Sequence, residues 1–305
     1  MIDPNSISLA DLLPVLNQHG EIERVLQLAL DEDLADAGDI TTLSLRNADE
    51  SVQGDLISRE DGIIAGLALV PTVLQLANCT STAWNVESAD GSPCQEGCVL
   101  GRLNGPMTEM FRVERTLLNI VGRLSGVATL TRKFAHAVTG TKAKICDTRK
   151  TTPGMRVLEK YAVRCGGGWM HRIGLFDAAL YKDNHLAGVR DAELSRFLED
   201  AIDRARTAND LQFVQVEVDR LSQLEGVLGM RPGLVDIVLL DNMDINQLRS
   251  AVEMRNRLSP NIQLEASGGV RLETVRAIAE TGVDRISVGA LTHSAKCLDV
   301  GLDIS

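Results

Sequence analysis

The feature that most constrains the fold is a regular alternation of short apolar runs and helical segments after Gly140. The runs have strand character, and apolar residues recur at three- and four-residue spacing between most of them. Strands that alternate with helices pair in parallel through right-handed crossovers. The runs cover residues 143–146, 179–181, 213–216, 237–240, 262–264 and 285–288, and the clearest helical segments cover 191–206, 245–258 and 272–281.

Six such repeats, spaced about 20 to 35 residues apart, are typical of a parallel α/β barrel. An open, doubly wound sheet is the alternative architecture. The sequence has no GxGxxG after the first strand, which disfavours the dinucleotide-binding form of that alternative. We therefore expect a barrel.

The N-terminal part of the chain follows a different pattern. Its first 30 or so residues have helical spacing, which Asp39-Ile40-Thr41-Thr42 interrupts. Residues 51–105 read as short strands and turns. Residues 107–138 then return to helical spacing, with an expected break near Gly126. We interpret this long helix as the link between an N-terminal domain and the barrel.

The distribution of charge indicates the kind of ligand. The chain has a net charge of −11, which disfavours nucleic acid as a partner. Between Lys142 and Arg190, however, ten basic and four acidic residues give a local charge of +6, whereas the rest of the chain carries −17. One basic segment in an acidic protein favours a small anionic ligand over a long polyanion.

The sequence gives no membrane signal. No apolar run approaches the roughly 20 residues that a membrane-spanning helix needs. The start of the chain, Met1-Ile2-Asp3-Pro4, has neither a basic nor an apolar signal-peptide region. We expect a cytoplasmic protein that does not bind membranes.

Polar residues end nearly every predicted strand. Because the carboxyl ends of parallel strands share one rim of a barrel, residues far apart in sequence should converge there. Lysine and arginine neutralise phosphate or carboxylate, and two carboxylates can hold Mg²⁺ or accept hydrogen bonds from sugar hydroxyls. This set therefore fits a phosphorylated ligand better than five unrelated surface charges. Its members are Arg149, Lys150, Lys182, Glu217 and Asp241.

Glycine-rich segments add a second signal. Ser267-Gly268-Gly269 and Gly289 each precede a helical segment, where backbone N–H groups can bind a phosphate. Simple tight turns are the alternative. A third run, residues 165–168, leads into His171-Arg172 and predicts a ligand-binding loop, with a flexible surface loop as the alternative. His185 at a strand end is better interpreted as a structural histidine.

A family resemblance rests on the run Asp147-Thr148-Arg149-Lys150-Thr151-Thr152-Pro153-Gly154-Met155-Arg156, which resembles the signature of quinolinate phosphoribosyltransferases. The similarity continues along most of the chain, and the long central motif is highly specific. Further matching segments are residues 39–42, 114–119, 159–164, 171–172, 182–185, 217–218, 240–242, 267–269 and 288–293.

The resemblance implies a two-domain α/β subunit. Residues 1–128 would form an N-terminal α/β sandwich that the C-terminal tail, residues 291–305, joins. Residues 129–290 would form an incomplete TIM-like parallel α/β barrel with fewer than eight strands. It also implies a homodimer with shared active sites, in which Arg115 enters the site of the neighbouring subunit. Whether dimers associate further is left open.

The resemblance also implies roles for single residues. Arg115, Arg149, His171 and Arg172 would bind the quinolinate carboxylates, and Lys150 and Lys182 would meet carboxylate or phosphate. Glu217 and Asp241 would hold the ribose hydroxyls and Mg²⁺, and the 5-phosphate would lie against the last two loops. The implied catalytic residues are Lys150, Lys182, Glu217 and Asp241, and the implied substrate-binding residues are Arg115, Thr148, Arg149, Lys150, His171, Arg172, Lys182, Glu217, Asp241, Ser267, Gly268, Gly269, Val288, Gly289, Ala290 and His293.

The implied reaction joins quinolinate to phosphoribosyl pyrophosphate and releases CO₂, which makes nicotinate mononucleotide for NAD biosynthesis. Mg²⁺ is the one cofactor implied. One departure from the family pattern is Trp169-Met170, where many members have a small residue and then Asn. Two other readings are a paralogue associated with molybdenum transport and a phosphate-binding barrel without enzymatic activity. The intact set of Arg115, Arg149, His171 and Arg172 disfavours the paralogue, and the paired carboxylates together with the dicarboxylate-binding arginines disfavour the non-enzymatic barrel.

Overall fold

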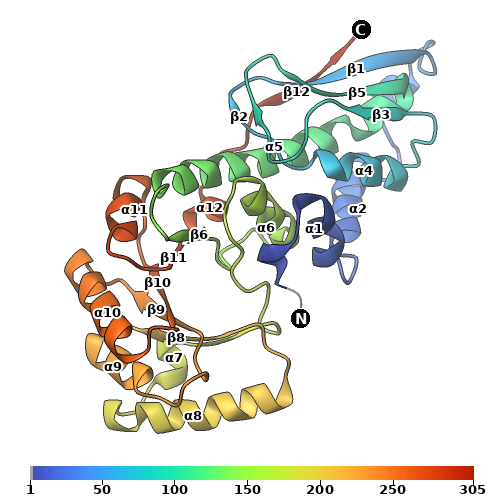
Figure 1. Cartoon of the computed structure of the whole chain (residues 1–305). Helices are drawn as coiled ribbons and strands as arrows, with labels where there is room; N and C mark the ends of the chain where they lie inside the picture. The colour runs from blue at the N-terminus through green and yellow to red at the C-terminus, as the bar shows by residue number, and fades with distance from the viewer. Residues whose placement is uncertain (1–2) are drawn as a thin grey trace. The chain divides into compact units, whose positions relative to one another are not determined.

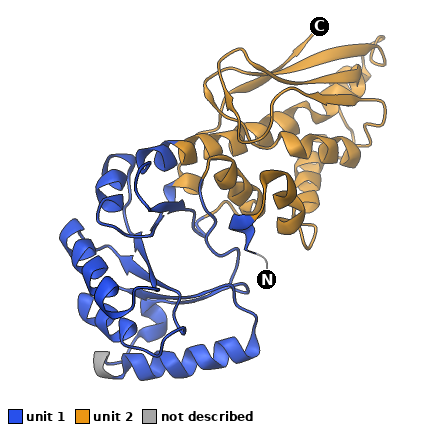
Figure 2. Ribbon diagram, viewed as in Figure 1, with its two compact units in different colours: residues 1–6, 133–150, 168–290 blue, residues 7–132, 151–167, 291–305 orange. Residues whose placement is uncertain are grey.

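The computed structural model describes residues 3–305 and divides the chain into two compact units (Figures 1 and 2). Unit 1 comprises the chain up to Ser6 with residues 133–150 and 168–290. Unit 2 comprises residues 7–132, 151–167 and 291–305. Met1 and Ile2, which entered the prediction of location, lie outside the described residues.

Unit 2 is built on an antiparallel sheet with the strand order β12-β1-β5-β3. Side chains from this sheet, from the long helix α5 and from the C-terminal tail share one apolar core, which includes Leu56, Leu118 and Leu298. Its elements are α1 (Leu9–Leu16), α2 (Glu21–Leu34), α3 (Ile40–Leu43), β1 (Ser51–Ser58), β2 (Gly62–Ile63), α4 (Val70–Leu76), β3 (Ala83–Val86), β4 (Pro93–Cys94), β5 (Val99–Pro106), α5 (Met107–Ala137, which ends in unit 1), α6 (Arg156–Cys165) and β12 (Val300–Ile304).

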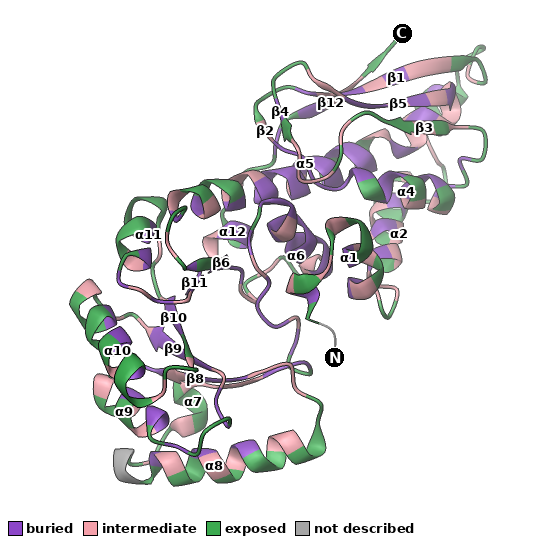
Figure 3. Ribbon diagram, in the orientation of Figure 1, coloured by how far each residue is buried: buried purple, intermediate pink, exposed green. Residues whose placement is uncertain are grey.

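The observed division agrees with the expected one for the tail and differs in three segments: residues 3–6 belong to unit 1, and residues 129–132 and 151–167 belong to unit 2. Strand β12 pairs with β1, so residues 291–305 belong with the N-terminal part of the chain, as expected. Residues 151–167, which we had placed in the barrel, belong to unit 2 instead. The reason is packing: α6 contacts α1 and α2, is buried along most of its length (Figure 3), and Tyr161 donates a hydrogen bond to Asp90 at 2.7 Å.

Unit 1 contains a sheet of six parallel strands in the order β6-β11-β10-β9-β8-β7. Apart from β6, each strand neighbours the next one in the chain, and the last strand returns to the first, which is the order of a barrel and not of a doubly wound sheet. The strands are β6 (Lys144–Cys146), β7 (Ala179–Tyr181), β8 (Val214–Val218), β9 (Ile237–Asp241), β10 (Gln263–Ser267) and β11 (Arg285–Ser287), and the helices are α7 (Asp183–Leu186), α8 (Asp191–Ala208), α9 (Leu221–Leu228), α10 (Ile245–Leu258), α11 (Leu272–Ala279) and α12 (Ala290–His293, which ends in unit 2).

All six predicted strands are present, and the mixed α/β architecture is confirmed. Among the described residues, β6 and β7 are not paired with each other, so the hydrogen-bonded sheet is open between them. Part of that opening is filled by the segment before His171, because Trp169 forms an isolated parallel bridge with Cys146. The sheet thus has fewer than eight strands, as expected.

The strand register assigns alternate residues to two different faces of this sheet. Glu217 pairs with Leu239, Leu239 with Glu265, and Glu265 with Arg285. Residues two positions away along each strand share this face. The opposite face carries Val216, Val238, Leu240, Leu264 and Ile286, all fully buried, and α9 packs against β8 and α11 against β11. One face is therefore apolar and covered by helices, and the other carries the polar residues.

Helix α5 runs without interruption from Met107 to Ala137, so the break expected near Gly126 was wrong. Gly126 has a packing role instead. A Cβ atom at this position would lie 1.8 Å from the backbone oxygen of Lys296. The absence of a side chain lets the tail pass directly over the helix on its way to β12. No helix in the described part of the chain is long and apolar enough to cross a membrane.

We predict that Gly126→Ala destabilises the protein by about 1–3 kcal/mol, because the tail backbone must move to make room for the methyl group. Gly226→Ala in α9 is the matched control, since its added Cβ would lie 3.4 Å from Ser195 Oγ. The control should be neutral or stabilise the protein by up to about 1 kcal/mol through helix propensity. Urea unfolding measures both; equal effects of the two substitutions would contradict the packing argument.

Candidate active site

The predicted residues of unit 1 lie at the carboxyl ends of the six strands. Residues 148–150 follow β6, Lys182 follows β7, and residues 288–290 follow β11. Glu217 is the second-last residue of β8, and Asp241 and Ser267 are the last residues of β9 and β10. Because the strands are parallel, these ends form one edge of the sheet. The structure therefore brings these residues to a common edge, as the strand pattern predicted.

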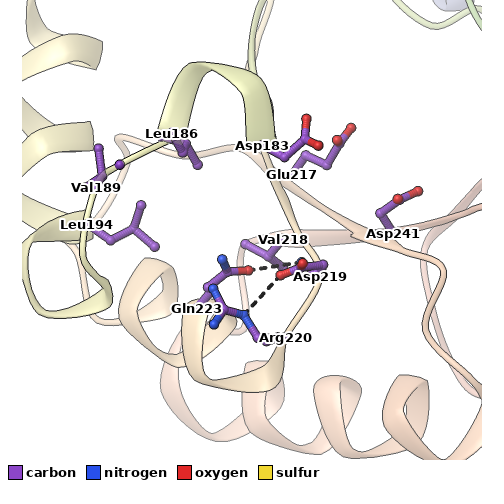
Figure 4. A pocket seen from close by; sticks show the side chains of 11 residues that line it. Asp183, Leu186, Val189, Leu194, Glu217, Val218, Asp219, Arg220, Gln223 and Asp241 are labelled. Carbon is purple, nitrogen blue, oxygen red and sulfur yellow. Dashed lines mark hydrogen bonds and ion pairs between the residues drawn. The ribbon is translucent and has the colours of Figure 1, made fainter.

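The acidic part of this edge has defined partners. Lys182 Nζ lies 3.0 Å from Glu217 Oε2, and Asp241 Oδ2 accepts a hydrogen bond from Asn242 Nδ2 at 2.7 Å. Glu217, Asp241 and Asp183 all line a pocket of about 330 Å³ (Figure 4). The three carboxylates thus border a space that can take part of a small polar ligand, and Lys182 pairs with one of them.

The basic part of the edge contains two neighbouring arginines. Arg172 is buried, and Arg149 is close enough to affect its pKa. Burial and the positive charge of Arg149 lower the pKa of Arg172, and Asp177 acts in the opposite direction. Arg149 Nε is buried and has no hydrogen-bond partner among the described residues. Two neighbouring guanidinium groups, one with an unused donor at Arg149 Nε, suit an anion with two acidic groups.

His171 is held in one orientation by its surroundings. Its backbone N–H donates to Asp147 Oδ1 at 2.7 Å, and its ring Nδ1 accepts the backbone N–H of Arg172 at 2.7 Å. A ring nitrogen that accepts carries no proton, so the proton of the neutral ring lies on Nε2. Nε2 lies 3.3 Å from Glu265 Oε1. The loop before Arg172 is therefore a fixed ligand-binding candidate and not a flexible surface loop.

Glu265 is a fully buried carboxylate that the sequence analysis did not include. Arg285 Nε donates to it at 2.7 Å, and Ser287 Oγ donates to its other oxygen. Burial alone would raise the pKa of Glu265, but His171, Arg285 and the hydrogen bond from Ser287 outweigh burial and hold the pKa far below its usual range. Glu265 therefore stays ionised and holds His171 Nε2 in place.

The loop after β10 explains one of the predicted glycines. Asn242, after β9, donates its backbone N–H to the Ser267 oxygen at 2.9 Å. A Cβ on Gly268 would lie 2.1 Å from Asn242 Oδ1, and Gly268 has φ of +101°. Both the space and the backbone conformation require glycine here. The turn places the N–H groups before α11 at the same edge as Asp241.

Two further expectations concern residues beside the site. His185 Nδ1 accepts the backbone N–H of Lys182 at 2.9 Å, which supports the structural reading of this histidine. Trp169 lines a pocket with residues that begin the strands, such as Ile237 and Gln263, so its bulk lies at the other edge of the sheet. The departure Trp169-Met170 leaves the positions of His171 and Arg172 intact.

Arg115 and His293 belong to unit 2, whereas the other predicted site residues belong to unit 1. Arg115 is exposed on α5 and donates to Asn119 at 2.8 Å within its own helix. His293 is exposed at the end of α12, and its Nδ1 lies 2.7 Å from Ser294 Oγ. Their part in the site stays a prediction.

Comparisons with known proteins agree with this geometry over nearly the whole chain. The family model described as "Quinolinate phosphoribosyl transferase, N-terminal domain" matches residues 39–125, and the model of the C-terminal domain matches residues 127–303. The chain belongs to the quinolinate phosphoribosyltransferase family.

Individual members of the quinolinate phosphoribosyltransferase family are similar along their full length. The carboxylating nicotinate-nucleotide pyrophosphorylase of Mycobacterium leprae is 43% identical, over 92% of this chain and 95% of that protein. A probable enzyme of the same name from Bacillus subtilis is 36% identical, over 94% of each chain. The crystal structure of nicotinate-nucleotide pyrophosphorylase from Ehrlichia chaffeensis aligns with a TM-score of 0.81 and 37% identity, over 92% of this chain and 98% of that one.

Several site residues of this family member were missed by sequence reasoning. Asp183 lies beside Glu217 in the pocket, and Asp147, Glu265 and Ser287 surround His171. Asp147 and Asp183 lie in segments that match the family, and Glu265 follows the apolar run 262–264 as a charge inside a buried strand. A charge inside a buried strand indicates either a partner or a function.

We predict that Glu265→Gln destabilises the protein by about 3–5 kcal/mol near neutral pH, because it leaves Arg285 buried without its counter-charge. The folded-state pKa of Glu265 is lowered, so its contribution to stability is present above the unfolded value of about 4.3 and decreases as the pH falls below it. Urea unfolding between pH 3 and 8 should therefore show the largest difference from wild type above about pH 5 and a smaller one below about pH 4.

Glu280→Gln is the matched control for this prediction, because it removes an equivalent carboxylate that pairs with Arg276 at 2.6 Å on the surface. Its effect should stay within about 1 kcal/mol at every pH. A Glu265→Gln difference that does not depend on pH would contradict an ionised Glu265.

Proposed function

We propose that this chain catalyses the transfer of a phosphoribosyl group from phosphoribosyl pyrophosphate to quinolinate with loss of CO₂. The products are nicotinate mononucleotide, pyrophosphate and CO₂, and the reaction belongs to de novo NAD biosynthesis. Family membership supports the reaction class. The observation that carries the proposal to this chain is the pair Arg149 and Arg172 beside a fixed His171, at the edge where Glu217 and Asp241 lie.

Arg149 and Arg172 are the residues proposed to contact the quinolinate carboxylates, and His171 is proposed to line the same site in a fixed orientation, because its ring nitrogens already contact Arg172 and Glu265. Adjacent carboxylates on one ring carry two negative charges a few ångströms apart, which matches two adjacent guanidinium groups. Arg172 is already oriented, since its Nη1 donates to the Ala178 oxygen at 3.1 Å. An aromatic acid with one carboxylate would leave part of this positive charge without a partner, so the site favours the diacid.

Glu217 and Asp241 are proposed to hold the ribose hydroxyls and Mg²⁺. The residues fit this ion, because two carboxylates on adjacent strands suit a cation that keeps several waters and shares substrate phosphates. Among the described residues no group of three or more acidic, histidine or cysteine side chains could hold a metal by itself, which suits an ion that arrives with the substrate. When bound, Mg²⁺ neutralises charge on the leaving pyrophosphate.

The proposed displacement needs mostly positioning and charge. The pyridine nitrogen attacks the anomeric carbon of the ribose as pyrophosphate leaves, and positive charge develops on the sugar. Glu217 and Asp241 suit that positive charge. Lys150 and Lys182 suit the growing negative charge of the leaving group, together with the 5-phosphate site proposed at Gly268, Gly269 and Gly289.

Decarboxylation follows from the product of the first step. The ring nitrogen becomes a pyridinium, whose positive charge stabilises the carbanion left when the adjacent carboxylate departs as CO₂. The electron pair of the broken bond is then protonated on the ring carbon. For this step the protein needs only to hold the ring and to leave the positive charge on its nitrogen. The step therefore requires no organic cofactor.

A homodimer with Arg115 in the partner's site is the proposed assembly. Supporting it, the chain exposes large apolar side chains in two segments that match the family, α3 and the loop that follows Arg172. Ile40 is 72% exposed, and Leu175 and Phe176 are 73% and 69% exposed. A second copy of the chain would cover them. The cytoplasmic location expected from the sequence stays a prediction.

The reaction is tested with purified protein, phosphoribosyl pyrophosphate and Mg²⁺. We expect quinolinate to give equal amounts of nicotinate mononucleotide and CO₂, and nicotinate, which lacks the second carboxylate, to give about 100-fold less product or none. Chromatography of the nucleotide and capture of labelled CO₂ measure the outcome. No product from either substrate with folded protein would contradict the reaction and favour the transport-associated paralogue.

The shared site is tested with Arg115→Ala and Lys150→Ala. Each substitution should lower kcat/KM about 10²–10³-fold, because each removes a cation that meets the substrates. Co-expression of the two variants in equal amounts should restore about a quarter of wild-type activity, since half of the dimers are mixed and each mixed dimer has one intact site.

Co-expression of Lys150→Ala with Arg149→Ala is the matched control. Both residues lie in the same segment of unit 1, so every site in a mixed dimer lacks one of them and activity should not recover. If the Arg115 and Lys150 variants do not complement each other either, Arg115 acts within its own chain and the shared site is wrong.

A further inference from the structure

The amino ends of the strands in unit 1 surround a second pocket, of about 480 Å³, that the proposed reaction does not use. Most of its lining residues begin or closely precede β8, β9, β10 and β11, so the pocket lies at the edge opposite Glu217 and Asp241. This volume is within the range of small-molecule sites.

The walls of this amino-end pocket combine polar residues with aromatic and aliphatic ones. Trp169 and Phe213 provide two aromatic rings, and Met170, Val235 and Ile237 provide buried aliphatic surface. Asn5 fixes one wall, because its side chain both donates to and accepts from the backbone of Met170, at 3.0 and 2.7 Å. A planar aromatic ring is the shape that such walls bind well.

Buried polar atoms without partners lie in the pocket wall, at Arg285, and in the strand row beside it, at Gln215. Arg285 lines the pocket and is 7% exposed, and its Nη2 has no hydrogen-bond partner among the described residues. Gln215 is fully buried, and both atoms of its amide lack a partner there. Gln215 shares its register row and face with Ile237 and Gln263, which both line the pocket. Such groups are rare in folded proteins and require a partner, either ordered water or a bound ligand.

The charges of the pocket select an uncharged ligand. Glu265 balances Arg285 at 2.7 Å, and Arg206 balances Asp236 at 2.8 Å. Asp3 adds a negative charge at the rim. A carboxylate beside Arg285 would meet a cation whose charge Glu265 already balances, at a cost in desolvation. It would also offer only acceptors, whereas the orphaned atoms comprise two donors and one acceptor.

We propose that this amino-end pocket is a second binding site, for a small uncharged aromatic carboxamide. The ring lies between the aromatic walls, the amide oxygen accepts from Arg285 Nη2, and the amide group also satisfies Gln215. The site is separate from that for quinolinate. Through Arg285 its occupant touches the same carboxylate, Glu265, that holds His171.

The test uses the full-length Trp84→Phe variant, in which Trp169 is the only tryptophan left. Benzamide is titrated while Trp169 fluorescence is recorded, with benzoate as the charged probe of the same shape, and with and without saturating quinolinate. We expect saturable quenching by benzamide that quinolinate does not compete away, and at least 10-fold weaker binding of benzoate. No saturable quenching, competition by quinolinate, or equal binding of benzoate would each overturn the proposal.

Two variants locate the site. Gln215→Leu keeps the side-chain volume and removes the orphaned amide, so it should fold normally and weaken benzamide binding about 10-fold. Gln223→Leu, the same substitution in the pocket of Figure 4, should leave benzamide binding unchanged. Equal benzamide affinity in the two variants, with both folded by circular dichroism, would show that Gln215 does not contact the ligand and would overturn the proposed site.

Discussion

The structure of unit 1 depends on the common register of six parallel strands. Because side chains alternate and the strands run in the same direction, each row of the sheet places one residue per strand on the same face. The face against the helices is uniformly apolar, as at Val216, Val238 and Leu264. The other face carries Glu217, Asp241, Glu265 and Ser267. The candidate site lies at the carboxyl end of this polar face, and the register determines which residues it contains.

A polar face inside a protein is costly unless each charge has a partner. Glu265, on β10, has such partners, because Arg285, Ser287 and His171 all contact its two carboxylate oxygens. The contact with His171 has a second consequence. Since Arg172 donates to the other ring nitrogen, both nitrogens of this histidine are engaged before any substrate arrives. Stability and preorganisation of the site therefore rest on the same carboxylate.

Most of this arrangement could be predicted from the sequence because it is local or periodic. The six apolar runs gave the strands, and polar residues after them gave the edge with Lys182, Glu217 and Asp241. What could not be predicted depends on contacts between distant segments. The assignment of α6 to unit 2 depends on α1, and Gly126 is explained only by the tail at Lys296. The pairing of Glu265 with Arg285 requires the register of β10 and β11, which spacing alone does not supply.

The same register also joins the two edges of the sheet. Arg285 begins β11 at the amino-end pocket, yet its guanidinium reaches the carboxylate that orients His171 near the opposite edge. Between Arg285 Nη2 and His171 Nε2 there is a single side chain, Glu265. A change in how Arg285 is solvated alters the field at Glu265 directly, since both groups are buried in a region of low dielectric constant. A molecule bound at the amino end of the strands would therefore act on Glu265, and through it on His171, without a movement of the backbone.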